Sequence, residues 1–252
     1  MLDPVKVELK ITELLEDFYK RRIATLSKLN LRETLKRKNP YLFRAIGTQQ
    51  ANEIVEALLQ AYMSSSDEGI FGNVFFEPLA KFVSGGVVND AEGIDISIEK
   101  NHTYTAIAVK SGTHIFNSTS KKKQEDYFKI LENRLRKLRK HFDPVVGYCY
   151  GRKGISKVGR PKAWREIAGQ AFWQELTGDK DFYLKIIRLM KEKPKNHLPE
   201  YKIEWDMAVN RFTRDFIKDF CFGDGRIDWE KIAVLNSGIK KKRTSKKKKS
   251  RK

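Results

Sequence analysis

The first 84 residues place apolar side chains among charged ones at helical spacing, which predicts a run of helices. Residues 5–29 repeat this spacing throughout, so we expect one long amphipathic helix there. A second helix is predicted over 48–63 and a third over about 67–83, with the Ser-Ser-Ser-Asp run at 64–67 supplying the cap of the third. Pro78 lies inside the third helix and predicts a kink or an early stop.

After Gly85 and Gly86 the pattern changes from helical spacing to alternation, which is typical of β-strands. Isoleucines alternate with polar residues over 93–99, and a second apolar run follows over 104–110. Four residues, 100–103, separate the two runs, and Asn101 and His102 in their middle can make the turn. The two runs therefore predict an antiparallel hairpin.

The remainder predicts a basic helix over 121–140, a short buried strand over 145–150 and a loop rich in glycine and positive charge over 151–162. From Trp164 to about Phe222 the chain is expected to be mostly helical or irregular. The order of helices, hairpin, helix, strand and helices favours an α/β domain in which a small mixed β-sheet is flanked by helices.

We expect one domain over 1–239. It would comprise a helical N-terminal part over about 1–84, a core of hairpin and sheet over about 85–185 and a helical C-terminal part over about 186–239. A low-complexity basic tail over 240–252 should be disordered when free.

The charge of the chain indicates a polyanionic partner. There are 51 Lys and Arg against 32 Asp and Glu, a net charge of +19. The tail over 240–252 holds ten of the basic residues and no acid, so the rest has 41 against 32 and keeps +9. Nucleic acid is the most common partner of such a protein. The tail itself would be either a non-specific DNA-binding arm or an aid to solubility.

Several other classes of protein are disfavoured by what the sequence lacks. No apolar run approaches the roughly 18–20 residues of a membrane span, and the N-terminal residues lack the apolar stretch of a signal peptide. Cys149 and Cys221 form neither a disulfide framework nor a metal motif, and the four histidines are scattered. We therefore expect a cytoplasmic protein, with Cys149 a small buried apolar residue.

Candidate chemistry lies on the predicted hairpin, which brings Asp95 of one strand close to Lys110 of the other. A carboxylate can hold a hard cation such as Mg²⁺ through oxygen, and the cation can activate a phosphodiester and a water. An ammonium group can orient that water or stabilise charge on the phosphate. The spacing alone is common in proteins, and each residue would by default be an ordinary surface residue of a strand.

Further motifs in the same order strengthen this interpretation. The Gly-Ile-Asp-Ile run at 93–96 and the Ala-Ile-Ala-Val-Lys-Ser-Gly run at 106–112 resemble the active-site hairpin of the PD-(D/E)XK nucleases. Four additional segments resemble one group of type II restriction endonucleases, and the likeness spans about residues 35–185. These segments are Lys-Asn-Pro-Tyr-Leu-Phe-Arg at 38–44, Ser-Ser-Ser-Asp-Glu before Phe-Gly-Asn within 64–73, Lys-Ser-Gly leading to Asn-Ser within 110–118, and Gly-Tyr-Cys-Tyr-Gly at 147–151.

The resemblance implies a restriction-endonuclease-like core and Mg²⁺-dependent cleavage of double-stranded DNA that leaves 5′-phosphate and 3′-hydroxyl ends. It implies Asp95 as a metal ligand together with the carbonyl of Val109, and Lys110 as the catalytic lysine. It also implies a homodimer acting on a palindromic site and a DNA methyltransferase that protects the host genome.

The sequence departs from the nuclease motif at one position, because Ala108 stands where the motif has an acid. Some nucleases of this class take the missing carboxylate from a neighbouring helix, which makes Glu77 the preferred candidate. Glu68 lies nine residues earlier, on roughly the opposite face of a regular helix. Glu92 and Glu99, near the first hairpin strand, are the other options.

Candidate DNA-binding residues follow the catalytic lysine and continue into the two basic segments. The small polar residues after Lys110 would let a phosphate backbone approach closely, or would only form a turn and a helix cap. The basic residues would contact phosphates, or would only form a solvated surface. The candidates are Ser111, Asn117, Ser118, Lys121, Lys122, Lys123, Arg152, Lys153, Lys157 and Arg160.

Two rival functions stay open at this point. One is a non-catalytic nucleic-acid-binding protein on the same fold, in which Ala108 marks a decayed active site. The other is an RNA-processing or ribosome-associated protein. Cleavage assays on duplex DNA and on RNA would separate the three.

Overall fold

The structure, a computed structural model, describes residues 3–85, 87–88, 91–153 and 163–238. The chain divides into two compact units, each built from separate stretches of sequence. The first unit comprises Met1–Arg22 and Ser66–Pro199, and the second comprises Ile23–Ser65 and Glu200–Lys252. The sheet and the candidate catalytic residues belong to the first unit. One nuclease domain over 1–239 stays a prediction.

The first unit contains a five-stranded mixed sheet. Its strands lie side by side in chain order: β1 (Val87–Val88), β2 (Ile96–Lys100), β3 (Thr103–Lys110), β4 (His141–Tyr148) and β5 (Arg165–Ala168). The first three strands are antiparallel, whereas β3, β4 and β5 are parallel to one another. Asn101 and His102 join β2 to β3 with positive φ angles of 49° and 61°, as tight hairpins require. The predicted hairpin and the mixed α/β fold are confirmed.

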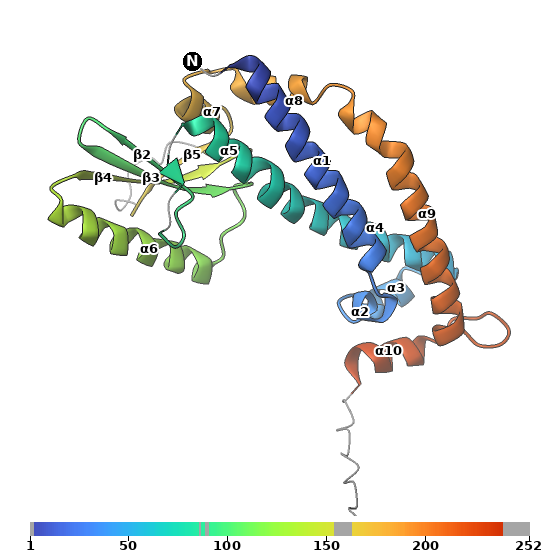
Figure 1. Cartoon of the computed structure of the whole chain (residues 1–252). Helices are drawn as coiled ribbons and strands as arrows, with labels where there is room; N and C mark the ends of the chain where they lie inside the picture. Colours follow the sequence, from blue (N-terminus) through green and yellow to red (C-terminus); the bar gives the residue numbers. More distant parts are fainter. Residues whose placement is uncertain (1–2, 86, 89–90, 154–162, 239–252) are drawn as a thin grey trace, which may run out of the picture. The chain divides into compact units, whose positions relative to one another are not determined.

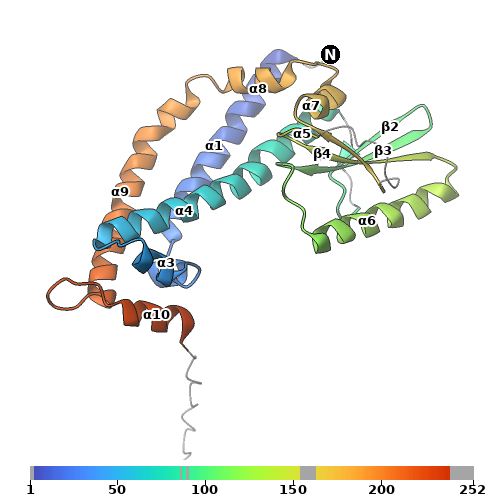
Figure 2. The ribbon, with the colours of Figure 1, turned by 180° about the vertical axis from the view of Figure 1, so that it is seen from behind.

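Helices cover both faces of the sheet (Figure 1). On one face, Ile96, Ile107 and Val145 pack into a core with α5 (Glu77–Ser84), α7 (Gln170–Thr177), α8 (Phe182–Met190) and the first part of α1 (Pro4–Lys28). On the other face, Ala108 and Val146 pack against α6 (Ser118–Lys137), which runs along the sheet in both views (Figure 2). This burial on both faces explains why β3 and β4 are almost continuously apolar.

The long first helix is confirmed as α1, but the predicted break at 64–67 is wrong. These residues lie inside α4 (Ala51–Phe71). The side chain of Asp67 accepts a hydrogen bond from Arg22 Nε of α1, at 2.8 Å, and so is not used as a helix cap. The irregularity comes later, in a π-helical turn, η1 (Gly72–Phe76), directly before α5. Pro78, at the start of α5, has no N–H to donate back, which accounts for the change in winding before it.

The segment after Trp164 also differs from the prediction, because it begins with a strand. β5 pairs in parallel with β4 from Val145 to Tyr148. With only four residues, β5 is too short for its periodicity to be recognised in the sequence. The predicted basic helix is confirmed as α6, and the predicted short strand is confirmed within β4.

The second unit is helical. It contains α2 (Leu31–Leu35), α3 (Pro40–Ala45), α10 (Trp229–Ser237) and the adjoining parts of α1, α4 and α9 (Lys193–Phe220). Its core includes Leu26, Leu58, Phe212 and Phe216, all of them buried. Asn39 caps α3 by accepting hydrogen bonds from the backbone N–H groups of Tyr41 and Leu42. In the described parts of both units, no helix has the length and apolar content to cross a membrane.

Arg165 holds β5 in place, which leads to a stability prediction. Its guanidinium donates to both carboxylate oxygens of Asp143 on β4, at 2.8 Å each, and to Glu175 on α7. Arg165→Leu would leave two carboxylates without their partner, so we expect a loss of about 1–2 kcal/mol in the free energy of unfolding. This is less than a fully buried pair would cost, because the arginine side chain is 39% exposed. Urea unfolding measures it.

The same ion pair makes this stabilisation depend on pH. Burial alone would raise the pKa of Asp143, but the hydrogen bonds and the charge of Arg165 outweigh burial and leave that pKa below its usual value. Because the folded pKa is the lower one, the stabilisation is complete above the ordinary aspartate range and is lost as the pH falls through the folded pKa. The difference between wild type and Arg165→Leu should therefore shrink in acid. Arg136→Leu, which breaks a single exposed pair with Glu132, is the control and should change little.

Candidate active site

Asp95 lies immediately before β2, where its backbone and its side chain are both held by β3. Its N–H donates to the carbonyl of Ile107 at 2.9 Å, and its carboxylate Oδ2 accepts from the N–H of Val109 at 2.7 Å. The side chain is half-buried. These contacts fix the carboxylate beside the last residues of β3.

Lys110 is the last residue of β3 and lies opposite Tyr148 in the parallel ladder with β4. Its carbonyl accepts a hydrogen bond from the N–H of Cys149 at 2.8 Å. Its positive charge acts on Asp95 and lowers the pKa of that carboxylate. The carboxylate of Asp95 is therefore bonded to the residue that precedes Lys110, and the charge of Lys110 acts on it.

Glu77 supplies a second carboxylate to the same place. It lies in the first turn of α5, and its Oε1 forms an ion pair with Nζ of Lys81 at 2.6 Å. Its negative charge acts on Asp95 and raises the pKa of that carboxylate. Glu77 is thus near enough to Asp95 for the charge of one carboxylate to act on the other.

The balance of these effects leaves the pKa of Asp95 above its usual value. Burial makes the largest contribution, and the charge of Glu77 adds to it. The hydrogen bond from Val109 and the charges of Lys110 and Lys81 act in the opposite direction without cancelling the rise. The ionised form of Asp95 is therefore disfavoured, as expected for a carboxylate that is mostly removed from water and has a second negative charge nearby. A divalent cation between the two acids would relieve this cost.

The other carboxylates considered from the sequence have partners elsewhere. Glu68 accepts a hydrogen bond from the hydroxyl of Tyr150 at 3.1 Å, and Glu99 accepts one from Lys140 at 2.6 Å. Glu92 is exposed, and it bonds the hydroxyl of Tyr127 and pairs with Lys123. Of these four glutamates, Glu77 is the one whose charge acts on Asp95.

The carboxylates of Asp95 and Glu77 suit a hard cation that keeps several water molecules as ligands. Over the residues that the structure describes, no three His, Cys, Asp or Glu side chains form a group that could hold a metal ion. Mg²⁺, however, is commonly held by one or two carboxylates, with water and substrate phosphate completing its shell. The oxygens of Asp95 and Glu77 fit that requirement.

The comparisons with known proteins identify the family. A family model for the type II restriction endonuclease EcoO109I matches residues 5–197, well over half of the chain. The chain belongs to this restriction endonuclease family. The resemblance found in the sequence motifs is thereby confirmed. Among curated proteins, no sequence matches the chain.

Two residues that are not among the predicted site residues also interact with Glu77 or Asp95. Lys81 is ion-paired with Glu77. Its position four residues after Glu77 on a helix is the feature of the sequence from which this pair could be predicted. Cys149, directly after β4, is 3% exposed. Its burial raises the pKa of the thiol, and the charges of Glu77 and Asp95 raise it further. The thiol of Cys149 is thus buried and protonated, which agrees with the prediction of a small buried residue.

The loop after Lys110 packs closely against its neighbours. A Cβ on Gly72 of η1 would lie 2.1 Å from Oγ of Ser111, and a Cβ on Gly112 would lie 2.6 Å from the ring of Tyr150. The carbonyl of Ser111 accepts from the N–H of Tyr150 at 3.0 Å. The small residues therefore allow the loop, the π-helical turn and the end of β4 to meet beside Lys110.

The structure describes most of the predicted DNA-binding residues, but not all of them. Asn117 is the N-cap of α6 and accepts from the N–H of Ser120 at 2.8 Å, which is the capping role considered from the sequence. Ser118 and Lys121–Lys123 begin α6 and are exposed. Arg152 and Lys153 are exposed, and Lys153 lies 3.9 Å from Glu166. Lys157 and Arg160 lie outside the described residues.

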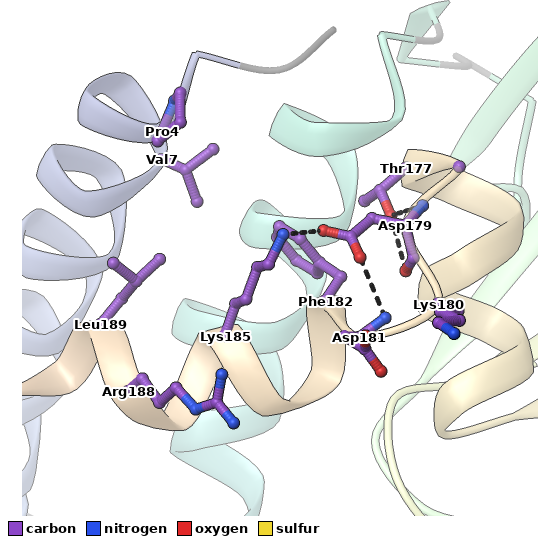
Figure 3. Close-up of a pocket in the computed structure, with 11 residues that line it drawn as sticks. Pro4, Val7, Thr177, Asp179, Lys180, Asp181, Phe182, Lys185, Arg188 and Leu189 are labelled. Atoms are coloured by element: carbon purple, nitrogen blue, oxygen red, sulfur yellow. Dashed lines mark hydrogen bonds and ion pairs between the residues drawn. The ribbon is translucent and has the colours of Figure 1, made fainter.

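The first unit also contains a cavity of about 980 Å³, which Figure 3 shows with the residues that line it. It is lined by Pro4 and Val7 of α1, by the turn before α8 and by side chains of α8 that include Lys185. The carboxylate of Asp179 pairs with Lys185 across it. It shares no residue with the Asp95 site, so it is not the place of the predicted chemistry.

The raised pKa of Asp95 predicts that this side chain costs stability when no metal is bound. Asp95→Asn keeps an oxygen that can accept from Val109 but removes the buried charge. In EDTA at pH 7 we expect the free energy of unfolding to rise by about 1 kcal/mol, a usual size for a single stabilising substitution. Urea unfolding measures the change.

The pH dependence of this gain has a definite sign. Because the folded pKa of Asp95 is raised, the wild type bears the cost above that pKa and loses it as the pH falls below the ordinary aspartate range. The gain from Asp95→Asn should therefore vanish in acid. Saturating Mg²⁺ should also cancel it, since only the wild type would be stabilised by binding. An unchanged gain in Mg²⁺ would argue against a cation at Asp95.

Proposed function

We propose that the chain is a Mg²⁺-dependent type II restriction endonuclease that cuts double-stranded DNA and leaves 5′-phosphate and 3′-hydroxyl ends. The observation that supports this best is that the carboxylate of Asp95 bonds the N–H of Val109, next to Lys110, while the charges of Lys110 and Glu77 both act on that carboxylate. Family membership supports a nuclease, and these three residues supply the chemistry that a nuclease needs.

In this proposal each residue has a distinct role. The carboxylates of Asp95 and Glu77, with the carbonyl of Val109, would hold Mg²⁺. When bound, Mg²⁺ would supply polarisation of the phosphoryl group and a lower pKa for a coordinated water. Lys110 would orient or deprotonate the water that attacks phosphorus in line, and would stabilise negative charge on the phosphate. The catalytic residues are therefore Asp95, Glu77 and Lys110.

The basic residues beside the site would hold the DNA backbone. Ser111 and Gly112 lie directly after Lys110, where a small-residue loop lets a phosphate approach closely. Ser118, Lys121, Lys122 and Lys123 at the start of α6 would add phosphate contacts, as would Arg152 and Lys153. Asn117, Lys157 and Arg160 stay candidates from the sequence.

The proposed reaction also suggests an oligomeric state, a partner enzyme and a location for the protein. A homodimer would match the two-fold symmetry of a palindromic site. A cognate DNA methyltransferase would protect the host genome, and the protein would act in the cytoplasm. Gel filtration at several concentrations tests the dimer.

Incubation of supercoiled plasmid with the protein tests the function. With Mg²⁺ we expect discrete linear fragments that DNA ligase can rejoin, because ligation requires 5′-phosphate and 3′-hydroxyl ends; with EDTA we expect none. A gel shift without cutting would instead support a DNA-binding protein with a decayed site, as Ala108 would then imply. Cleavage of RNA but not of duplex DNA would support an RNA-processing role.

A further inference from the structure

Lys81 occupies a particular position beside the proposed metal ligands. It follows Glu77 by four residues on α5, a spacing that places the two side chains on one face of the helix. Its Nζ lies 2.6 Å from Oε1 of Glu77, with the two side chains 26% and 34% exposed. This is a short charge-assisted contact in a partly desolvated place, where such contacts are stronger than at the open surface.

The charges at the site balance in the absence of metal. Glu77 and Asp95 supply two negative charges, and Lys81 and Lys110 supply two positive ones that act on the same carboxylate, Asp95. Lys110 has a proposed part in the reaction, but Lys81 has none. In the structure, Lys81 neutralises the carboxylate of Glu77, which in the proposed function binds a cation.

We propose that Lys81 is an internal counterion that competes with the divalent cation for Glu77, and so sets how tightly the site binds metal. This inference rests on the proposed function. Lys81 is a positioning residue, because it acts through Glu77. Without a cation it keeps the carboxylate compensated, and a cation that binds must displace its ammonium group from Oε1 or tolerate a positive charge nearby.

Metal titration without DNA tests the proposal with a readout that does not depend on cleavage. Isothermal titration calorimetry with Mg²⁺ compares wild type with Lys81→Met. Since a nearby charge changes the occupancy of a carboxylate site by about tenfold or more, we expect Lys81→Met to bind Mg²⁺ at least about tenfold more tightly. Lys81→Arg keeps the charge and should bind nearly as the wild type does.

A matched control and a double variant complete the experiment. Lys129→Met breaks an ion pair of the same spacing on α6, between Lys129 and Glu125 at 2.8 Å, and should leave Mg²⁺ affinity unchanged. In a Glu77→Gln background, Lys81→Met should give a much smaller gain, because the carboxylate for which lysine and metal compete is gone and only the weaker effect of Lys81 on Asp95 is left. Circular dichroism checks that each variant is folded, and Lys81→Gln serves as a second neutral variant.

Two results would overturn the proposal. One is Mg²⁺ binding by Lys81→Met and Lys81→Gln that is no tighter than that of the wild type. The other is a gain that is equally large in the Glu77→Gln background, which would show that Lys81 does not act through Glu77. Failure of the proposed function would be seen separately, as wild-type protein that binds Mg²⁺ but does not cut plasmid.

Discussion

Lys110→Ala is expected to lower the rate of DNA cleavage by at least about 100-fold, the usual cost of removing one donor that stabilises a transition state. The charge of Lys110 acts on Asp95, and in the proposed function its ammonium group orients the attacking water and stabilises negative charge on the phosphate. DNA affinity should stay largely intact, because many basic side chains share the backbone contacts. Single-turnover cleavage and gel-shift titration measure the two quantities.

Lys100→Ala is the matched control for this experiment. Lys100 ends β2 and pairs with Thr103 across the turn, at the opposite end of the hairpin from the site. This variant removes the same charge from the same hairpin and should cut at the wild-type rate. If Lys110→Ala also cuts at that rate, Lys110 is not the catalytic lysine.

Glu77→Gln is expected to lower cleavage by about 100-fold or more, because the loss of a metal ligand should cost no less than the 10–100-fold typical of residues that only support a ligand. Glutamine keeps the size of the side chain but has no charge to offer a cation. Raising the Mg²⁺ concentration should recover part of the activity, which a folding defect would not allow. Cleavage rates across a Mg²⁺ series measure the effect.

The three other glutamates provide controls for Glu77. Glu68→Gln, Glu92→Gln and Glu99→Gln should each change cleavage by less than about threefold, a difference of well under 1 kcal/mol. Their side chains bond Tyr150, Tyr127 and Lys140 rather than facing Asp95. A large loss in one of these variants, with Glu77→Gln active, would assign the missing carboxylate of the motif to that residue.

The hairpin was predictable from the sequence because its determinants are local. Alternating apolar residues and a two-residue turn fix the pairing of β2 with β3, and that pairing places Asp95 near the last residues of β3. The choice of Lys110 as the catalytic lysine needed the resemblance to a nuclease family as well, since an acid and a lysine at this spacing are common.

Features that depend on tertiary contacts could not be predicted in the same way. The Ser-Ser-Ser-Asp run at 64–67 has the composition of a helix cap, yet α4 continues through it because Asp67 pairs with Arg22 of another helix. The preference for Glu77 could be argued only by analogy. The comparison of Glu77 with Glu68 assumed one regular helix between them. The π-helical turn η1 interrupts that helix and so changes the direction of the Glu77 side chain relative to Glu68.

The most direct test of the central claim, that Asp95 and Glu77 share one divalent cation beside Lys110, is a crystal structure with Mn²⁺. Manganese accepts the oxygen ligands that suit magnesium, and its anomalous scattering locates it independently of the protein density. We predict one strong anomalous peak bonded to carboxylate oxygens of both Asp95 and Glu77. Crystals of protein that cuts DNA with Mn²⁺, but whose Mn²⁺ contacts neither carboxylate, would contradict the account.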